Sequence, residues 1–179
     1  MEEHHHSDEY LDLVDEDDQV IGRKLRSEIY AEGLSNFRVI NAFIVNTKGE
    51  LWIPRRALTK RIYPLCLDMS VGGHVESGEI YDQAFARETK EEVNLEIAKV
   101  PWRFLDKLTP RQDKVSAYMH VYEIQWNATP LYSLDDFVED FWLTPRALLD
   151  RIAAGDRAKS DLPKLVKRFY LEKKSASSL

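Results

Sequence analysis

Apolar residues occupy both faces of the segment FRVINAFIV, residues 37–45. In an extended segment, odd and even positions point to opposite sides. Both sets are apolar here apart from Arg38 and Asn41. Strands that are apolar on both faces lie inside a sheet, so this segment is predicted to be a central strand. The polar turn Thr47–Glu50 and the run Leu51–Pro54 complete a predicted hairpin.

Shorter patterns of the same kind predict the remaining elements. The predicted strands are two short segments around a polar turn at Glu16–Asp18, a segment over Leu67–Val75 that Gly72 and Gly73 interrupt, and segments over Trp102–Leu108, Val115–Trp126 and Phe141–Leu143. The predicted helices are one turn over Arg26–Ala31, a helix over residues 80–94, a helix that begins at Thr144 and Pro145, and a last helix over Asp161–Lys173. A regular βαβ alternation is absent, so the prediction is an α+β fold, with a mixed sheet sandwiched between helices.

The length of 179 residues is typical of one domain. Residues 10–172 are predicted to form that domain, between a disordered N-terminus at 1–9 and a flexible tail at 173–179. The three histidines His4–His6 are interpreted as part of the solvated end and not as a metal tract.

Charge and cysteine content narrow the class of protein. The net charge is 25 − 31 = −6, so no basic field is available for nucleic acid, and a small anionic ligand would need local cations or a metal. Cys66 is the single cysteine, which excludes an intrachain disulfide and fits a reducing compartment. The sequence shows neither a long apolar run nor a signal-peptide pattern, so we expect a cytoplasmic protein without a membrane partner.

Three glutamates crowd one side of the helix predicted over residues 80–94. Helical residues advance by about 100°, so Glu88, Glu91 and Glu92 span an arc of roughly 100°. Like charges at this spacing repel one another. A hard divalent cation would neutralise them, and Mg²⁺ also bridges carboxylates to substrate phosphates. A plain solvated acidic helix has the same spacing, so the three glutamates alone leave both interpretations open.

The flanking residues resemble the Nudix box: glycine, five residues, glutamate, seven residues, then R-E-U-x-E-E-x-G-U, where U is bulky and aliphatic. The chain has Gly73, then Glu79, then Arg87–Leu95 in this register. Six fixed residues match over twenty positions. Thr89 replaces an aliphatic residue, and Asn94 replaces the last glycine, although asparagine also suits a left-handed helix end. Neither replacement removes a candidate ligand.

This resemblance covers roughly residues 10–172 and implies the Nudix fold. It also implies hydrolysis of a diphosphate linked to another moiety, usually in a nucleoside diphosphate derivative. Arg87 is then expected to pair with Glu79 and to brace the site. The ligands implied for Mg²⁺, or for Mn²⁺ in its place, are Glu88, Glu91, Glu92 and the carbonyl of Gly73.

The general base is left open among three carboxylates. Glu91 or Glu92 would act from within the box. Glu139 would act from SLDDFVEDFW, which we predict to be a loop before a strand and which also reads as a plain acidic loop.

Cations follow the strand LWIP at Arg55, Arg56 and Lys60. They are predicted to bind phosphate oxygens of a small phosphorylated substrate, with surface solubility as the plain alternative. Trp52 and Tyr118 are candidates for stacking on a base, although aromatic residues on strands are more often part of the core.

The order of segments also resembles the branch that includes isopentenyl-diphosphate isomerase. Those isomerases carry a catalytic cysteine two positions before a metal-binding histidine. Here the segment is SVGGH, so Gly72 stands at the cysteine position before His74, and Cys66 lies six residues earlier. Without that thiol the sequence favours hydrolysis of a nucleoside di- or triphosphate. Isomerisation and a catalytically silent nucleotide-binding module are the alternatives.

Overall fold

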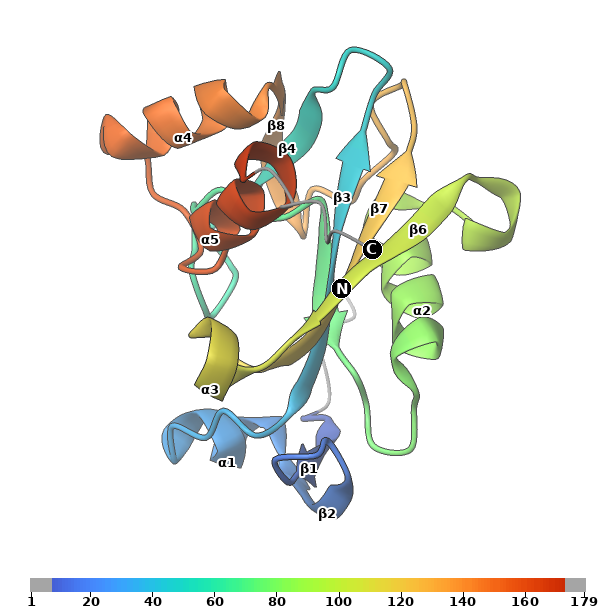
Figure 1. Cartoon of the computed structure of the whole chain (residues 1–179), viewed down its shortest axis with the longest axis vertical. Helices are drawn as coiled ribbons and strands as arrows, with labels where there is room; N and C mark the ends of the chain where they lie inside the picture. Colours follow the sequence, from blue (N-terminus) through green and yellow to red (C-terminus); the bar gives the residue numbers. More distant parts are fainter. Residues whose placement is uncertain (1–7, 173–179) are drawn as a thin grey trace, which may run out of the picture.

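Strand β3 (Arg38–Val45) is the centre of a six-stranded mixed sheet in the computed structural model, which describes residues 8–172 (Figure 1). Along one edge, β3 pairs in parallel with the whole of β7 (Tyr118–Gln125). Along its other edge, β5 (Val71–His74) pairs antiparallel with the first half of β3, and β4 (Leu51–Arg56) pairs only at the end. The predicted two-sided central strand is therefore confirmed.

The outer strands complete the order β6-β7-β3-β4-β8. Strand β6 (Trp102–Leu108) lies at one edge and β8 (Phe137–Leu143) at the other. A separate hairpin of β1 (Tyr10–Val14) and β2 (Val20–Leu25) leads into α1 (Arg26–Ala31). The predicted turn between the first two strands is present.

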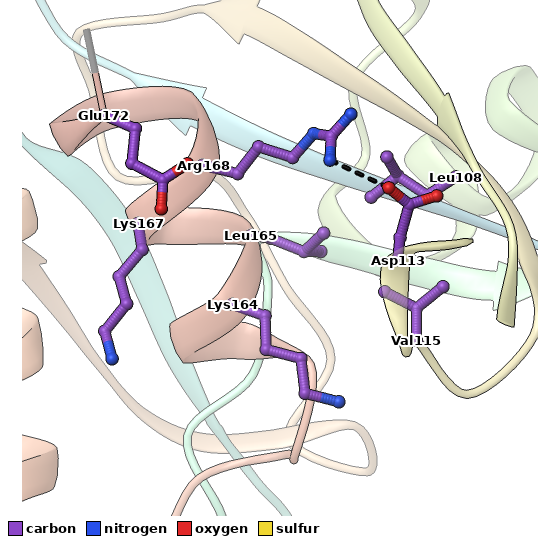
Figure 2. Close-up of a pocket in the computed structure, with 8 residues that line it drawn as sticks. All are labelled: Leu108, Asp113, Val115, Lys164, Leu165, Lys167, Arg168 and Glu172. Atoms are coloured by element: carbon purple, nitrogen blue, oxygen red, sulfur yellow. Dashed lines mark hydrogen bonds and ion pairs between the residues drawn. The ribbon is translucent and has the colours of Figure 1, made fainter. Parts of the chain in front are cut away.

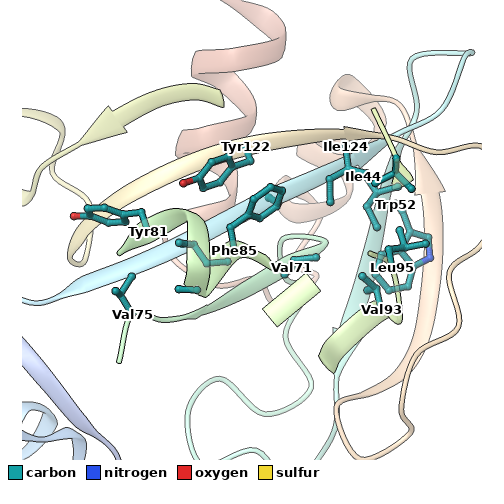
Figure 3. Packing of buried hydrophobic residues seen from close by; sticks show 14 of the residues in the cluster. Ile44, Trp52, Val71, Val75, Tyr81, Phe85, Val93, Leu95, Tyr122 and Ile124 are labelled. Carbon is teal, nitrogen blue, oxygen red and sulfur yellow. The ribbon is translucent and has the colours of Figure 1, made fainter. Parts of the chain in front are cut away.

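Helix α2 (Tyr81–Val93) covers one face of the sheet. Phe85 stacks on Tyr122 of β7 with ring centroids 4.0 Å apart, within the apolar cluster drawn in Figure 3. Thr89 is fully buried on the packed side of the helix. The helix ends at Asn94 with φ 51°, which confirms the predicted left-handed cap.

The opposite face of the sheet is covered by the C-terminal helices (Figure 1). They are α4 (Pro145–Ala153), α5 (Leu162–Val166) and a π-helical turn η2 (Lys167–Leu171). The hydroxyl of Thr144 accepts a hydrogen bond from the backbone N–H of Ala147 at 3.2 Å, so the predicted N-cap is confirmed. With α2 on the other face, the α+β sandwich is also confirmed.

Two short helical segments connect the strands, η1 (Ile97–Lys99) before β6 and α3 (Pro110–Asp113) after it. A pocket of about 290 Å³ lies between α3 and α5–η2 (Figure 2). Arg168 donates to Asp113 at 2.8 Å across it. This ion pair joins η2 to α3.

Some predicted boundaries are wrong. The segment Leu67–Val75 is not a strand broken by glycines, because Gly72 and Gly73 lie inside β5 and pair with β3. Strand β8 begins at Phe137, so Glu139 belongs to a strand and not to a loop. The last helix is α5 followed by the wider turn η2. Predictions for residues 1–7 and 173–179 fall outside the described residues.

No helix among residues 8–172 combines the length and the apolar character that a membrane crossing needs.

Candidate active site

The loop between β5 and α2 is fixed by two carboxylates. Asp12 of β1 accepts hydrogen bonds from the Ser77 hydroxyl at 2.6 Å and from the Gly78 N–H at 3.0 Å. Glu79 accepts from the Glu76 N–H at 2.9 Å. Gly78 has φ +87°, a conformation that suits glycine. The N-terminal hairpin therefore supports the loop that leads into the glutamate helix.

Arg87 and Glu79 form the pair that the sequence predicts. The Arg87 Nε and Nη2 atoms donate to the two Glu79 carboxylate oxygens at 2.9 and 2.8 Å. Nη2 also donates to the His74 carbonyl at 3.0 Å. Burial alone would raise the pKa of Glu79, but the hydrogen bonds from Arg87 lower it below its usual value. The pair ties α2 to the end of β5.

The same guanidinium compensates the crowded glutamates. Its Nη1 atom lies 2.8 Å from a Glu88 oxygen and 3.4 Å from a Glu91 oxygen. The Glu91 side chain is 58% exposed, whereas that of Glu88 is 14% exposed. The positive charge of Arg87, a residue of the box, therefore reduces the repulsion among the glutamates.

Gly73 makes room for the Glu88 carboxyl group. A Cβ atom at Gly73 would lie 2.0 Å from the Cδ and Oε1 atoms of Glu88. Gly73 does not have a positive φ, so the site uses its missing side chain and not its backbone freedom. Burial raises the pKa of Glu88 to about 7, against the opposing effect of Arg87.

Glu92 lies one helical turn after Glu88 and contacts the neighbouring glycine. Its Oε2 atom accepts a hydrogen bond from the Gly72 N–H at 3.0 Å. Burial, and then the charge of Glu88, raise the pKa of Glu92 well above its usual value, and Asp68 and Asp136 add to the effect. Two carboxyl groups that resist ionisation therefore lie against the backbone of β5.

The donors at this place fit a hard divalent cation. Carboxylate oxygens and a peptide carbonyl are the ligands that such ions take, and a cation would relieve the charge that burial disfavours at Glu88 and Glu92. Within residues 8–172, no three acidic or imidazole side chains form a ready-made metal cage. The side chains point to other partners, since Glu88 and Glu91 contact Arg87 and Glu92 contacts Gly72. The predicted ligand roles, including that of Gly73, remain predictions.

The three predicted phosphate-binding cations separate into two groups. Arg56 donates to Asp68 at 2.7 Å, and Lys60 forms an ion pair with Asp136. Asp68 also contacts Lys159 at 3.1 Å, and Lys159 Nζ lies 3.7 Å from the Cβ position of Gly72, so the Arg56–Asp68 pair lies beside the box.

Arg55 has other partners. It binds the two oxygens of Asp156 at 2.8 and 2.9 Å and also pairs with Glu139. Within the part of the chain that the structure describes, no hydrogen bond or ion pair links Arg55 or Glu139 to Glu88, Glu91 or Glu92. The structure thus does not bring the Glu139 candidate base into contact with the box.

The aromatic candidates are part of the core. Trp52 is fully buried and donates its indole N–H to Asp140 at 2.9 Å. Tyr118 is 7% exposed. Neither ring presents a free face to a base, so the plain interpretation holds for both.

His74, the last residue of β5, packs against Tyr30 and Phe37. Its Nε2 atom is 2.9 Å from the Tyr30 hydroxyl, and its ring stacks on Phe37. Burial, followed by the charges of Arg26 and Lys159, lowers its pKa to about 3.

Sequence reasoning missed Asp68 and Lys159 beside the box. Lys159 Nζ lies 3.1 Å from Asp68, which also binds Arg56. Asp68 lies in an apolar segment with no motif, and Lys159 is 67 residues after Glu92 in the chain, by 159 − 92. No local signal in the sequence connects them.

Comparisons with known proteins agree with this arrangement. A family model described as the NUDIX domain matches residues 36–163. An uncharacterized Nudix hydrolase of Nostoc sp. is 57% identical over 162 residues, which cover 90% of this chain and 96% of that protein. A crystal structure from Deinococcus radiodurans superposes with a TM-score of 0.86 at 49% identity, and the match covers 90% of this chain and 99% of the other. An isopentenyl-diphosphate Δ-isomerase of Kocuria rhizophila is 28% identical over 153 residues, which cover 83% of this chain and 84% of that protein.

The sheet, the box helix and its Arg87–Glu79 brace are those of a Nudix protein. The chain belongs to the Nudix family and is a Nudix pyrophosphohydrolase, with a weaker similarity to the isopentenyl-diphosphate isomerases.

Proposed function

We propose that the protein is a Mg²⁺-dependent hydrolase that cleaves a phosphoanhydride bond in a nucleoside di- or triphosphate or a related derivative. The observation that carries this proposal is the pair of buried carboxyl groups, Glu88 and Glu92, packed against Gly73 and Gly72. Their raised pKa values describe a place where a cation is favoured. Arg56 lies beside the same place and can meet substrate oxygens.

In the proposed mechanism, the glutamates of the box share two tasks, which are to hold a cation and to accept a proton. Glu88, Glu91 and Glu92, with the Gly73 carbonyl, would hold the cation, which would polarise a phosphoryl oxygen and activate water. Arg87 keeps Glu88 and Glu79 in place through its hydrogen bonds. A carboxylate takes the proton as the water oxygen bonds to phosphorus and the bridging oxygen leaves with the other phosphate.

Glu92 is our first choice for that proton acceptor within the box. Its carboxyl group is held in place by the Gly72 N–H at 3.0 Å, one helical turn from Glu88, so it is oriented toward the proposed cation site. Glu91 is the second choice. Glu139 is third, because its ion pair is with Arg55.

The test is a panel of nucleoside di- and triphosphates with Mg²⁺, scored for released phosphate or pyrophosphate. Glu92→Gln is the matched variant, since an amide oxygen can still accept from the Gly72 N–H. We expect hydrolysis by the natural protein and no turnover by Glu92→Gln, with an unchanged circular dichroism spectrum. Natural rates in that variant would remove Glu92 from the proposal.

A parallel assay uses isopentenyl diphosphate, because of the weaker similarity to its isomerases. Gly72 offers no thiol at the position where those enzymes carry cysteine, and a Cβ atom there would already lie 3.0 Å from Asn41 Oδ1. We expect no isomer. Isomer formation would replace the proposal with isomerase activity, and nucleotide binding without turnover would replace it with a silent binding module.

A further inference from the structure

The segment from Asp156 to Lys159 is brought to the box by a backbone pairing that joins distant parts of the chain. The Leu67 N–H donates to the Arg157 carbonyl at 2.8 Å, and the Lys159 N–H donates to the Leu67 carbonyl at 2.9 Å. These bonds form a parallel bridge between Leu67 and Ala158. The backbone that carries Lys159 is therefore fixed beside the segment that leads into β5.

The start of this segment is also anchored through side chains. Asp156 accepts two hydrogen bonds from Arg55 and one from Arg151 at 2.6 Å. These bonds lower the pKa of Asp156, with the Arg55 contact as the main cause. Arg55, which sequence reasoning assigned to the substrate, thus holds the backbone from which Lys159 extends.

Lys159 and Arg56 share one buried carboxylate. Asp68 is 3% exposed, and its Oδ1 atom lies 3.1 Å from Lys159 Nζ while its Oδ2 atom accepts from Arg56 at 2.7 Å. Two cations on one anion leave a surplus of one positive charge. The Lys159 side chain is 23% exposed, so part of it can be reached from solvent.

This ammonium group lies next to the carboxylates of the box. A Cβ atom at Gly72 would be 3.7 Å from Lys159 Nζ, and the N–H of the same Gly72 binds Glu92 at 3.0 Å. Gly72 therefore lies between Lys159 and Glu92 and is close to both. Any larger residue at position 72 would fill the space between Lys159 and Asn41.

We infer that Lys159 is a substrate-binding residue that contacts a phosphate oxygen of the diphosphate, with Asp68 holding its ammonium group in position and Arg56 holding Asp68. This inference rests on the proposed function and adds a residue to it. Lys159 forms an ion pair with Asp68 at 3.1 Å, and an ammonium group has three donors with which it can also meet an anion. Its Nζ atom lies 3.7 Å from the position that a Cβ atom at Gly72 would occupy, beside the carboxylates of the box.

The experiment compares Lys159→Ala and Lys159→Arg with Lys48→Ala, an exposed lysine in the β3–β4 turn. Binding of inorganic pyrophosphate is measured by calorimetry in metal-free buffer, and kcat and KM are measured with the best nucleotide. We expect Lys159→Ala to weaken pyrophosphate binding and to raise KM, each about tenfold or more. We expect Lys159→Arg to recover part of both losses and Lys48→Ala to change neither. Lys159→Gln takes the place of the alanine variant if that variant does not fold.

A lower unfolding temperature for Lys159→Ala, with pyrophosphate affinity and KM unchanged, would overturn the inference and leave Lys159 as a link between two segments. Absence of pyrophosphate binding by the natural protein would overturn it as well. If the natural protein binds pyrophosphate through Lys159 but hydrolyses no nucleotide, the proposed function fails and the inference stands.

Discussion

Replacing Gly73 with alanine separates catalysis from stability. The new Cβ atom would lie 2.0 Å from the Glu88 carboxyl group, whereas carbon atoms in contact stay about 3.5 Å apart. The carboxyl group must therefore move by roughly 1.5 Å. Metal–ligand distances tolerate only about 0.2 Å, and a misplacement of about 1 Å costs on the order of 100-fold in rate. We expect kcat/KM to fall by at least about 100-fold, or about 2.7 kcal/mol of transition-state stabilisation.

The fold should tolerate the same substitution. The clashing atoms are the end of a flexible side chain, and Glu88 can turn toward solvent. That movement breaks its hydrogen bond with Arg87 but also releases a carboxyl group whose pKa burial has raised to about 7. The two effects oppose each other, so we expect the free energy of unfolding to change by about 1 kcal/mol or less.

Urea unfolding, Mn²⁺ titration followed by electron paramagnetic resonance, and nucleotide hydrolysis test these expectations together. Gly22→Ala is the matched control, because nothing lies within 4 Å of a Cβ atom at that position. It should leave all three measurements unchanged. If Gly73→Ala bound Mn²⁺ and turned over nucleotide as well as the unchanged protein does, the claim that Gly73 makes room for the Glu88 carboxyl group would be refuted.

Two further predictions concern stability. The Thr89 hydroxyl is buried without a hydrogen-bond partner among the described residues, so Thr89→Val should raise the free energy of unfolding by about 1 kcal/mol and the melting temperature by about 2–4 °C. A lower melting temperature would show that the hydroxyl has a partner. Burial lowers the pKa of His120 from 6.5 to about 4, so the unfolded chain binds more protons and stability falls as the pH drops from 6.5 toward 4. His120→Phe keeps an aromatic ring on Tyr81 and should reduce the slope of the free energy of unfolding against pH, measured by urea unfolding across this range. The slope should not vanish, because His74 also has a lowered pKa. An unchanged slope would contradict the assignment to His120.

Spacing along the chain was enough to predict the elements that depend on neighbouring residues. The two-sided pattern of residues 37–45 predicted the central strand, and the helical character of residues 80–94 predicted α2. The resemblance to the Nudix box implied the contact between Arg87 and Glu79. Asn94 was readable as a helix end because a left-handed cap is a property of one residue. In each case the partners lie within one strand or within about two helical turns.

Tertiary structure decided the features that join distant segments. Gly72 and Gly73 looked like a break in a strand until the pairing of β5 with β3 placed them against Glu88 and Glu92. Arg55 and Arg56 are adjacent in the sequence, yet one holds Asp156 and the other holds Asp68.

Lys159 is the clearest case, because only the pairing of its backbone with Leu67 brings it to the box. Local periodicity records which side of an element faces the core, but it carries no information about which distant strand or loop lies beside it. The sequence by itself therefore determined the box and its brace, and only the fold decided which cations and carboxylates surround it.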